Sequence, residues 1–425
     1  MVEVRILREN TPKAITALEK RGIETAEQMI REVIELDDQR KELQSKTDAL
    51  LQKVNEQSRA IGDLYKQGMT SEANEAKELV RQWKVDITAF QEEMDAVMSN
   101  LEHALLAMPN LPHDSVPAGQ DESDNEVVEL HDHFGTDSED WYKPHWELME
   151  KYDIVDLALG AKITGSGFPV YKGQGARLQR GLIQFFLNEA VSAGCLEVIP
   201  PYVVNADSAR GTGQLPDKDG QMYYVQKDDL YLIPTSEVPL TNMFRNEILE
   251  AAKLPFKLTA YSPCFRREAG SYGADVKGLN RLHQFDKVEM VVISHPENSY
   301  EMLDWMVNHT KKLLEKLELP YRVVRLCGGD LGFTSALTYD FEVYSVAQKR
   351  WLEVSSVSNF ETYQSNRMKM RYRNDEGKTE LVHTLNGSVL ALPRIMAAIL
   401  EKNQTKTQID LPEVIKPYVG FDCIK

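Results

Sequence analysis

The sequence predicts an α+β protein, in which a long antiparallel coiled-coil hairpin precedes a domain built on a mostly antiparallel β-sheet flanked by helices. Two segments, about 27–64 and 72–108, carry apolar residues at alternating spacings of three and four, the pattern of a coiled-coil seam. Residues 109–126 contain three prolines and many acidic residues, as a linker does. Within 127–425, runs in which apolar and polar residues alternate occur in pairs, as in β-hairpins, and strands do not follow helices in regular order. This pattern favours antiparallel strands. We therefore expect a helical domain over 1–108, a linker, and a larger α+β domain.

The composition is typical of a soluble globular protein. The chain has 425 residues, 42% hydrophobic and 27% charged, which is enough for two domains with cores of their own. Its formal net charge of −17 argues against wholesale electrostatic binding of nucleic acid, so a polyanionic partner must be met by local basic patches or by shape. The N-terminal segment MVEVRILREN has no apolar core of signal-peptide type, and no run approaches the roughly 20 apolar residues of a membrane span.

The four cysteines, Cys195, Cys264, Cys327 and Cys423, are scattered and form no C-x-x-C pair. This spacing argues against a zinc site and against a disulfide framework. A reducing, cytoplasmic location is therefore expected.

The two helical segments should meet at a turn that contains Gly68. At 1.5 Å per residue, a helical arm of ~35 residues is about 50 Å long, so it can reach a distant partner. Acidic residues outnumber basic ones on both helices, and charge therefore does not decide the role of the arm. A dimerisation coil, an inert spacer and a binding arm all remain open.

Further elements follow from local patterns. Residues 141–159 have the spacing of an amphipathic helix, and 176–193 form a second helix that Gly194 should end. Gly173 and Gly175 make a G-x-G without the third glycine of a dinucleotide fingerprint, so they are interpreted as turn formers. The other expected elements are a small helix at 12–21, strands at 168–171, 195–204, 231–234, 338–346, 350–356 and 379–386, a loop at 210–216, and helices at 297–318 and from Ser388 to Glu401.

The stretch 261–290 reads as a long β-hairpin around a glycine-containing connection. Side chains alternate along a strand, so one arm presents Cys264, Arg266 and Glu268 together. The same alternation groups five residues of the other arm, namely Arg281, His283, Phe285, Lys287 and Glu289. Phe285 and Glu289 should be roughly 13 Å apart, which leaves room for a nucleotide base at one end and a small polar ligand at the other. From alternation alone, a surface hairpin with solvated charges is the simpler alternative.

Three signatures together resemble the class II aminoacyl-tRNA synthetases. FRRE and HQF, separated by a long loop, resemble the second signature; NGSVLALPR resembles the third; and the helix 176–193 running into Pro200-Pro201 resembles the first. Within that class, the chain resembles the seryl-tRNA synthetases of the bacterial type over essentially its whole length. The stretches that carry this resemblance are TSEVPLT, FRREAGSYG, GLNRLHQFDKVEM, EVSSVSNFETYQSNR and the helical hairpin.

The resemblance implies that the chain activates L-serine with ATP and then transfers serine to the 3′-end of tRNA(Ser), with tRNA(Sec) as a further expected substrate. It also implies a homodimer, a class II catalytic domain and no zinc. The reaction needs positioning and cations rather than an acid–base residue, because negative charge accumulates on a crowded phosphoryl centre.

The resemblance also implies site residues for ATP. Arg266 would hold the α-phosphate and the serine carboxylate, Glu268 would read the adenine edge, and Phe285 and Arg394 would lie on either side of the adenine. Arg266, Glu268 and Arg394 are thus the expected catalytic residues, while Arg267 should matter less. The full expected ATP set is Arg266, Arg267, Glu268, Phe285, Glu353, Val354, Ser355, Ser356 and Arg394. Within that set, Glu353 and Ser356 would hold a Mg²⁺ ion.

For serine, the resemblance assigns Glu289 and Ser388 to the hydroxyl and Glu237 to the ammonium group. A pocket that hydrogen-bonds a hydroxyl rejects alanine, because its own polar groups would be left unpaired. The full expected serine set is Thr235, Ser236, Glu237, Arg266, Glu289, Asn386 and Ser388.

The family likeness favours the binding role for the arm, which would grip the long variable arm of the tRNA across the dimer by shape and backbone. The loop 270–280, with Lys277 and Arg281 near its end, would meet the tRNA acceptor end and close over ATP. Pro393-Arg394 departs from the Glu-Arg that ends the third signature in most class II enzymes. Two other functions stay open: a ligase that charges a carrier protein, and a non-catalytic scaffold on a synthetase fold.

Overall fold

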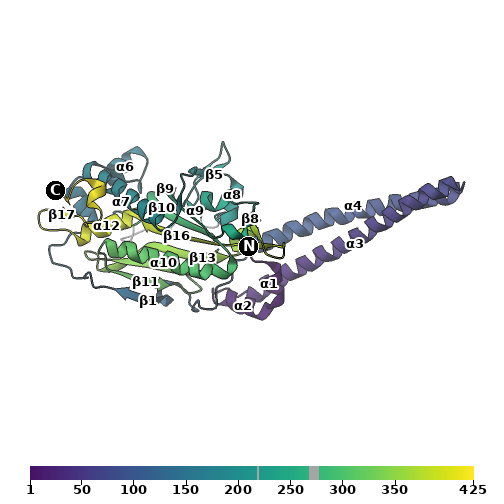
Figure 1. Ribbon diagram of the computed structural model, residues 1–425, viewed down its shortest axis with the longest axis horizontal. Coiled ribbons are helices and arrows are strands. Elements are labelled where there is room, and N and C mark those ends of the chain that lie inside the picture. The colour runs from purple at the N-terminus through teal and green to yellow at the C-terminus, as the bar shows by residue number, and fades with distance from the viewer. Residues whose placement is uncertain (218–219, 268–276) are drawn as a thin grey trace. The chain divides into compact units, whose positions relative to one another are not determined.

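The computed structural model describes residues 1–217, 220–267 and 277–425 (Figure 1). Its contacts divide the chain into two compact units. One unit comprises Val2–Glu19 and Ile23–Pro109; the other comprises Met1, Lys20–Gly22 and Asn110–Lys425. None of the helices in these described ranges is long and apolar enough to cross a membrane.

The first unit is helical. Two short helices, α1 (Val4–Glu9) and α2 (Thr11–Glu19), precede the long α3 (Ala26–Lys66) and α4 (Thr70–Ala107), which run antiparallel. Gly68, with φ at +79°, lies in the turn that reverses the chain. The two long helices lie within two residues of the predicted ranges at each end, whereas α1 falls in a mixed stretch where no helix was expected.

The seam of the arm is apolar, as the spacing predicts. Val54, Val80 and Ile87 are buried in it, and Trp83 is partly buried against them. Nearer its base, the seam also holds a buried carboxylate, Asp37, which Arg8, Arg40 and Lys41 contact at 2.8–2.9 Å. Burial favours the protonated form of Asp37, but hydrogen bonds from Lys41, Arg40 and Arg8 outweigh it and lower its pKa to about 2. This ion-pair cluster ties α1 to the base of the arm.

The second unit is built on one eight-stranded sheet. Its strands run in the order β1-β11-β12-β13-β16-β10-β9-β4 and are antiparallel except for the β4–β9 pair. Their bounds are β1 Glu126–His131, β11 Tyr321–Arg325, β12 Leu337–Ser345, β13 Arg350–Glu361, β16 His383–Ala391, β10 Gln284–Ser294, β9 Phe256–Phe265 and β4 Leu196–Glu197. The sheet confirms the predicted α+β fold class with its mostly antiparallel sheet.

Helices α7 (Gly173–Ser192), α10 (Ser299–Lys316) and α12 (Leu392–Lys402) pack on the sheet (Figure 1). Phe185 of α7 and Met306 of α10 are fully buried in the shared apolar core. The remaining helices are α5 His145–Lys151, α6 Leu157–Ile163, α8 Ala206–Thr212, α9 Glu237–Asn242, α11 Tyr363–Met368 and α13 Lys416–Val419, with 3-10 turns at Glu122–Asp124, Ala251–Lys253 and Pro296–Asn298.

Short strands form four smaller sheets around the large one. They are β5 Val203–Val204 with β7 Leu230–Leu232 and β6 Tyr224–Val225, β15 Thr379–Leu381 with β14 Arg371–Arg373 and β8 Ile248–Glu250, β2 Val155–Asp156 with β3 Val170–Tyr171, and β17 Ile409–Asp410 with β18 Cys423–Ile424.

Several element predictions were wrong. The predicted strand 379–386 is divided between β15 in a small sheet and β16 in the large one, and Gly173 and Gly175, interpreted as turn formers, are the first and third residues of α7. The segment 141–159 is not one helix: α5 ends at Lys151, Asp153 takes a left-handed φ of 50°, and Asp156 caps α6 by accepting a hydrogen bond from Leu159 N–H at 2.7 Å. The predicted strand 195–204 is split between two sheets, as β4 and β5. Its middle is Pro200-Pro201, and proline has no N–H to donate to a ladder.

Two other boundaries also shift. Helix α8 continues to Thr212, inside the expected loop at 210–216. Strand β16 runs through Gly387-Ser388 to Ala391, beyond the predicted end of the strand, because β10 continues to pair with it as far as Ala391, whereas its pairing with β13 stops at Gly387.

A β-bulge interrupts β16 where it pairs with β10. Glu289 lies opposite Ser388, but Val288 lies opposite Leu390, so Val389 has no counterpart. Leu390 takes a φ of 146°, a strained value for a branched side chain.

Candidate functional site

A cavity of about 840 Å³ lies in the second unit, over strands β10, β13 and β16 and the start of α12, with Arg266 entering it just after the end of β9. Residues far apart in the sequence line it. Those that the sequence analysis had named are Thr235, Glu237, Arg266, Arg281, Phe285, Lys287, Glu289, Glu353, Val354, Ser355, Ser356, Asn386, Ser388 and Arg394.

Sheet register explains why these side chains converge. Glu289 of β10 lies opposite Ser388 of β16, and Asn386 lies opposite Ser358 of β13. Because alternate residues of a strand share a face, Phe285 and Glu289 both line the cavity, four residues apart. The hairpin that the sequence predicts therefore forms one wall of the cavity.

One end of the cavity is a buried polar cluster. Thr235 Oγ1 donates to Glu289 Oε2 at 2.7 Å, and Asn386 Nδ2 donates to Glu289 Oε1 at 3.1 Å. Lys287 forms an ion pair with Glu289, and both side chains are at least 94% buried. With its charge paired and its oxygens hydrogen-bonded, Glu289 is held in one orientation.

A second carboxyl group, Glu237, faces this cluster. It accepts hydrogen bonds from Gln364 Nε2 at 2.6 Å and from Asn386 Nδ2 at 2.8 Å. Burial, and then the charge of Glu289, raise the pKa of Glu237 to about 7. Such a carboxyl group gains from a cation placed beside it, so this end of the cavity suits a small ligand with an ammonium group.

The other end of the cavity is aromatic and basic. The Arg266 guanidinium carbon lies 5.2 Å from the centre of the Phe285 ring, and Arg266 Nε donates to Pro234 O at 3.4 Å. Arg394, in the first turn of α12, donates from Nε to Asn280 O at 3.0 Å. Its Nη1 lies 3.4 Å from Glu353 Oε2. Two arginines beside an aromatic face can hold a planar base and phosphate groups.

Oxygen ligands gather near Arg394. Glu353 and Ser356 both line the cavity, and Asp340 lies opposite Ser356 across the β12–β13 pair. Among the described residues, buried Asp340 Oδ1 has no hydrogen-bond partner. Burial, and then the charge of Glu353, raise the pKa of Asp340 well above its ordinary value. Two crowded carboxyl groups and a hydroxyl are the hard donors that suit Mg²⁺.

Several predicted site residues lie elsewhere. Glu268 lies outside the described residues. Arg267 and Ser236 are not among the described residues that line the cavity: Arg267 lies 5.3 Å from the Tyr223 ring centre, and Ser236 Oγ is 2.6 Å from Ser262 Oγ. Ser355 lines the cavity, but its hydroxyl donates to Ser388 O at 2.6 Å.

His283 does not join the predicted row of side chains on the second arm. Strand β10 begins at Gln284, so strict alternation stops there. The His283 ring instead stacks on Phe168, and its Nδ1 lies 2.7 Å from Tyr223 Oη.

Gln364, which no sequence pattern indicates as a site residue, positions Glu237 and accepts a hydrogen bond from Thr384 Oγ1 at 2.7 Å. Strand alternation correctly predicts the face on which Lys287 lies, but not its ion pair with Glu289. A glutamine in a short helix carries no local signal of such a contact, because the contact exists only after α11 packs beside β16.

The chain matches known proteins over both units. Residues 1–112 match the family model described as the seryl-tRNA synthetase N-terminal domain, and residues 223–403 match the tRNA synthetase class II core domain (G, H, P, S and T). Serine–tRNA ligases of Salinibacter ruber and Acidovorax ebreus are 48% and 45% identical to it, over 99% of this chain and 98% of each relative. The crystal structure of seryl-tRNA synthetase from Pyrococcus horikoshii complexed with ATP superposes with a TM-score of 0.93 at 33% identity, covering 100% of this chain and 99% of that one.

Proposed function

The chain belongs to the seryl-tRNA synthetase family and is a serine–tRNA ligase, and from this premise we propose that its 840 Å³ cavity binds serine and ATP end to end. The observation that carries the proposal is that the two ends of the cavity differ in chemical character. One end presents Glu237 and Glu289, while the other presents Phe285 and Arg394.

The reaction follows from this arrangement. A serine carboxylate oxygen forms a bond to the α-phosphorus of ATP, and the bond from that phosphorus to the bridging oxygen breaks, releasing diphosphate. The terminal ribose hydroxyl of the tRNA then attacks the seryl carbonyl carbon, and AMP leaves. Arg266 lies against Phe285 and is also close enough to Glu237 to act on its charge, so its guanidinium can hold both the serine carboxylate and the α-phosphate.

For serine, we assign the ammonium group to Glu237. The hydroxyl is assigned to Glu289, which Thr235 and Asn386 hold in place, with Ser388 beside it. Alanine would leave this buried cluster without its hydroxyl partner, so we expect the site to reject it.

For ATP, we propose that Phe285 and Arg394 lie on either side of the adenine, with Glu268 at its edge. Arg267, Val354 and Ser355 would be peripheral. Glu353 and Ser356 would hold a Mg²⁺ ion, and the partnerless oxygen of Asp340 fits this role. When bound, the ion neutralises phosphate charge. ATP binding that did not depend on Mg²⁺ would contradict these ligands.

The central test is serine-dependent pyrophosphate–ATP exchange followed by aminoacylation of total tRNA with each amino acid. We expect exchange with serine, and charging of tRNA with serine alone. Exchange without charging of tRNA would favour the carrier-protein ligase, and ATP binding without exchange would favour the scaffold.

The raised pKa of Glu237 predicts a pH dependence. Serine's ammonium selects the ionised carboxylate, so below pH 7 binding must displace a proton, and the KM for serine should rise up to about tenfold per pH unit as the pH falls. Above pH 7 the KM should level off. Lys287, Glu289 and Arg266 are the charged groups near Glu237 in the cavity.

In Glu237→Gln, the KM for serine should be higher at every pH and nearly independent of pH between 6 and 8. Glu250→Gln, which alters an exposed carboxylate on β8, is the matched control and should keep the parent profile. A Glu237→Gln profile that still rises below pH 7 would assign the titration to another group.

We further propose a homodimer. Leu196, in the edge strand β4, is 63% exposed, and Ile199, which follows it, is 83% exposed; such an apolar edge is suited to a partner. Sedimentation equilibrium should give twice the chain mass of 48.4 kDa, and a monomer at micromolar concentration would exclude this proposal.

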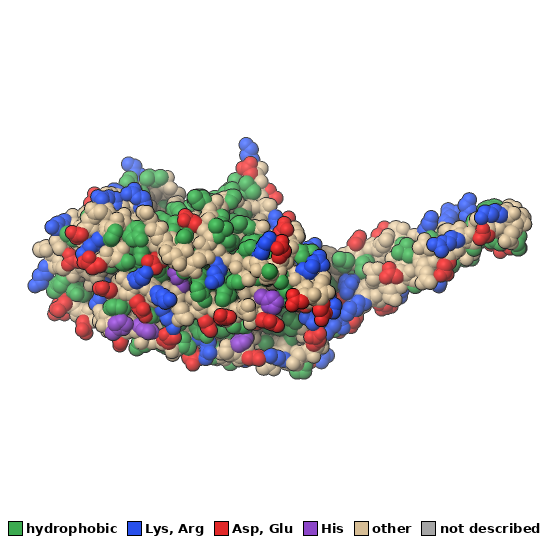
Figure 2. All heavy atoms as spheres, viewed as in Figure 1, with side chains coloured by type: hydrophobic (Ala, Val, Ile, Leu, Met, Phe, Trp, Pro, Cys, Tyr) green, Lys and Arg blue, Asp and Glu red, His purple; other side chains and the backbone are tan. Residues whose placement is uncertain are grey.

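We assign residues 1–108 to a tRNA-binding domain, 109–126 to a linker and 127–425 to the catalytic domain. Figure 2 shows Lys and Arg side chains gathered over the outer part of the helical arm. The exposed lysines and arginines of residues 50–87 are Lys53, Arg59, Lys66, Lys77, Arg81 and Lys84. Between residues 50 and 87 these six bases balance six acids, whereas the whole chain carries −17, so a polyanion meets less repulsion there.

The proposed RNA partners are tRNA(Ser) and tRNA(Sec), which charging of each purified tRNA would test. A cytoplasmic location follows from a role in protein synthesis, and cell fractionation would test it.

A further inference from the structure

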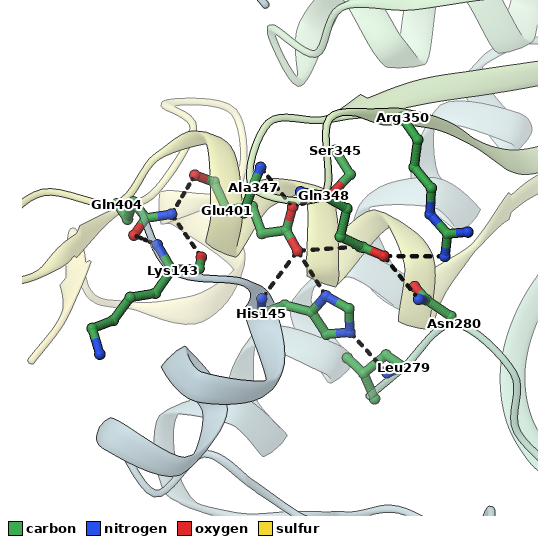
Figure 3. A network of polar contacts seen from close by, with 10 residues as sticks. All are labelled: Lys143, His145, Leu279, Asn280, Ser345, Ala347, Gln348, Arg350, Glu401 and Gln404. Carbon is green, nitrogen blue, oxygen red and sulfur yellow. Dashed lines mark hydrogen bonds and ion pairs between the residues drawn. The ribbon is translucent and has the colours of Figure 1, made fainter. Parts of the chain in front are cut away.

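A buried network links α5, α12 and the β12–β13 connection to the end of the hairpin loop (Figure 3). At its centre is His145, which is fully buried at the start of α5. Its Nδ1 lies 2.8 Å from Glu401 Oε1, and its Nε2 accepts a hydrogen bond from Leu279 N–H at 2.9 Å. A backbone N–H can only donate, so Nε2 must be unprotonated and Nδ1 must carry the proton. The contacts thus fix His145 as a neutral imidazole in one tautomer.

Glu401 anchors this imidazole. It is 1% exposed in α12 and accepts hydrogen bonds from His145 N–H at 3.0 Å and from Ser345 Oγ. Gln348 Nε2 also donates to it, at 3.4 Å. Burial opposes the charge of Glu401, but the hydrogen bonds from His145 and Ser345 outweigh it and lower the pKa of Glu401. The carboxylate therefore stays charged, and it holds His145 through both the backbone N–H and the ring Nδ1.

The loop end is fitted closely against this pair. Gly278 takes a φ of 69°, and a Cβ there would lie 2.2 Å from His145 Nε2. The next residue, Leu279, donates its N–H to His145, and Asn280 Nδ2 donates to Gln348 Oε1 at 3.1 Å. Two consecutive residues are thus fixed by the network.

One atom, the Asn280 carbonyl oxygen, connects the network to a side chain of the cavity. Asn280 O accepts the hydrogen bond from Arg394 Nε at 3.0 Å. The peptide that carries this oxygen follows Leu279 and Asn280 directly, so its direction depends on both of their contacts. In the part of the chain that the structure describes, Thr235, Glu289 and Asn386 at the serine end form no hydrogen bond or ion pair with the network.

We propose that His145 is a positioning residue for the ATP end of the site: with Glu401 behind it, it fixes Leu279 and Asn280 so that the Asn280 carbonyl aims the Arg394 guanidinium at ATP. The inference rests on the proposed role of Arg394. It goes beyond that role by making a buried histidine, distant in sequence from the three signatures, a determinant of ATP affinity.

Two substitutions separate positioning from packing. In His145→Asn, the short amide can still donate to Glu401 from near the Nδ1 position but cannot reach Leu279. In His145→Gln, the longer side chain can place its oxygen near the Nε2 position and accept from Leu279. We expect His145→Asn to raise the KM for ATP about tenfold with the KM for serine changed less than twofold, and His145→Gln to recover most of the loss. Pyrophosphate–ATP exchange measured over both substrates gives these values.

His309→Asn is the matched control. His309 is a buried histidine of α10, and its Nε2 has no hydrogen-bond partner among the described residues. This variant should leave the ratio of the two KM values unchanged. If His145→Asn raises both KM values alike, or neither, or if His145→Gln is no better than His145→Asn, the positioning role is wrong. Should His145→Asn not fold, Gln348→Met, which removes the acceptor of Asn280, is expected to show the same selective rise.

A double-mutant cycle separates this inference from the function beneath it. In an Arg394→Ala background, His145→Asn should have no further effect on ATP affinity measured by calorimetry, because the side chain that it positions is gone. An ATP affinity unchanged by Arg394→Ala would overturn the proposed role of Arg394 itself. An affinity lowered by Arg394→Ala but not by His145→Asn would overturn only the inference about His145.

Discussion

Replacing Arg394 by alanine is expected to slow serine-dependent pyrophosphate–ATP exchange about a thousandfold. The Arg394 side chain lies at the cavity, is 25% exposed, and its contacts with the protein are to Asn280 O and Glu353. It therefore contributes its charge to the ligand more than its bulk to the core. With ATP bound, the loss of a planar bidentate cation leaves phosphate charge uncompensated.

The measurement is the exchange rate at saturating serine and ATP, with thermal unfolding recorded beside it. The unfolding midpoint should stay within about 3 °C of the parent, because no core contact is removed. Arg373→Ala, which removes an exposed arginine of β14, is the control and should exchange normally. An Arg394→Ala protein that is folded and exchanges at the parent rate would refute the assignment.

Shortening the helical arm is expected to separate the two half-reactions. Excising residues 47–60 of α3 and 76–89 of α4 removes two heptads from each helix, which keeps both seams in phase and shortens the arm by about 21 Å. The antiparallel register makes the cuts match, since Lys46 lies over the Phe90 ring at 5.8 Å. The excision removes five of the six outer basic residues, sparing only Lys66.

Exchange should be unaffected by this excision, because the cavity lies wholly in the second unit. The kcat/KM for charging tRNA should fall by about a hundredfold or more, which corresponds to roughly 3 kcal/mol of lost binding. Circular dichroism would confirm that the shortened arm stays helical. Undiminished charging would return the arm to the role of a dimerisation coil or spacer, and sedimentation would decide between those two.

Local sequence patterns predict secondary structure correctly where a single spacing of apolar residues, helical or strand-like, continues over a long stretch. The arm is such a part, because its seam repeats over two helices and the predicted ends are nearly those observed. The pairing of β9 with β10 is another, since alternation places Phe285 and Glu289 on one face. Periodicity failed where short elements meet, as in 141–159, because a left-handed Asp153 and the β2–β3 pairing are tertiary features.

The same distinction holds for the site. Residues in the signature stretches could be named from the sequence, and the cavity brings most of them together. Gln364 and His145 could not, because each acts through a contact made only when distant elements pack. A buried glutamine or histidine looks, in sequence, like any other residue of a half-polar helix.

The bulge at Val389 means that the two ends of the cavity are held by separate halves of one strand. Before it, the cavity is lined by even-numbered residues, Asn386 and Ser388; after it, by Ala391, which leads into the helix that carries Arg394. The part of β16 before the bulge thus serves amino-acid selection, and the part after it serves nucleotide binding. The one extra residue of the bulge, Val389, separates the two parts. Mutations before Val389 can retune the choice of amino acid without re-aiming Arg394, whereas a deletion at the bulge would turn the nucleotide module to the wrong face of the sheet. Substitutions on either side of the bulge can therefore be tolerated during evolution, whereas a change in the length of the strand cannot.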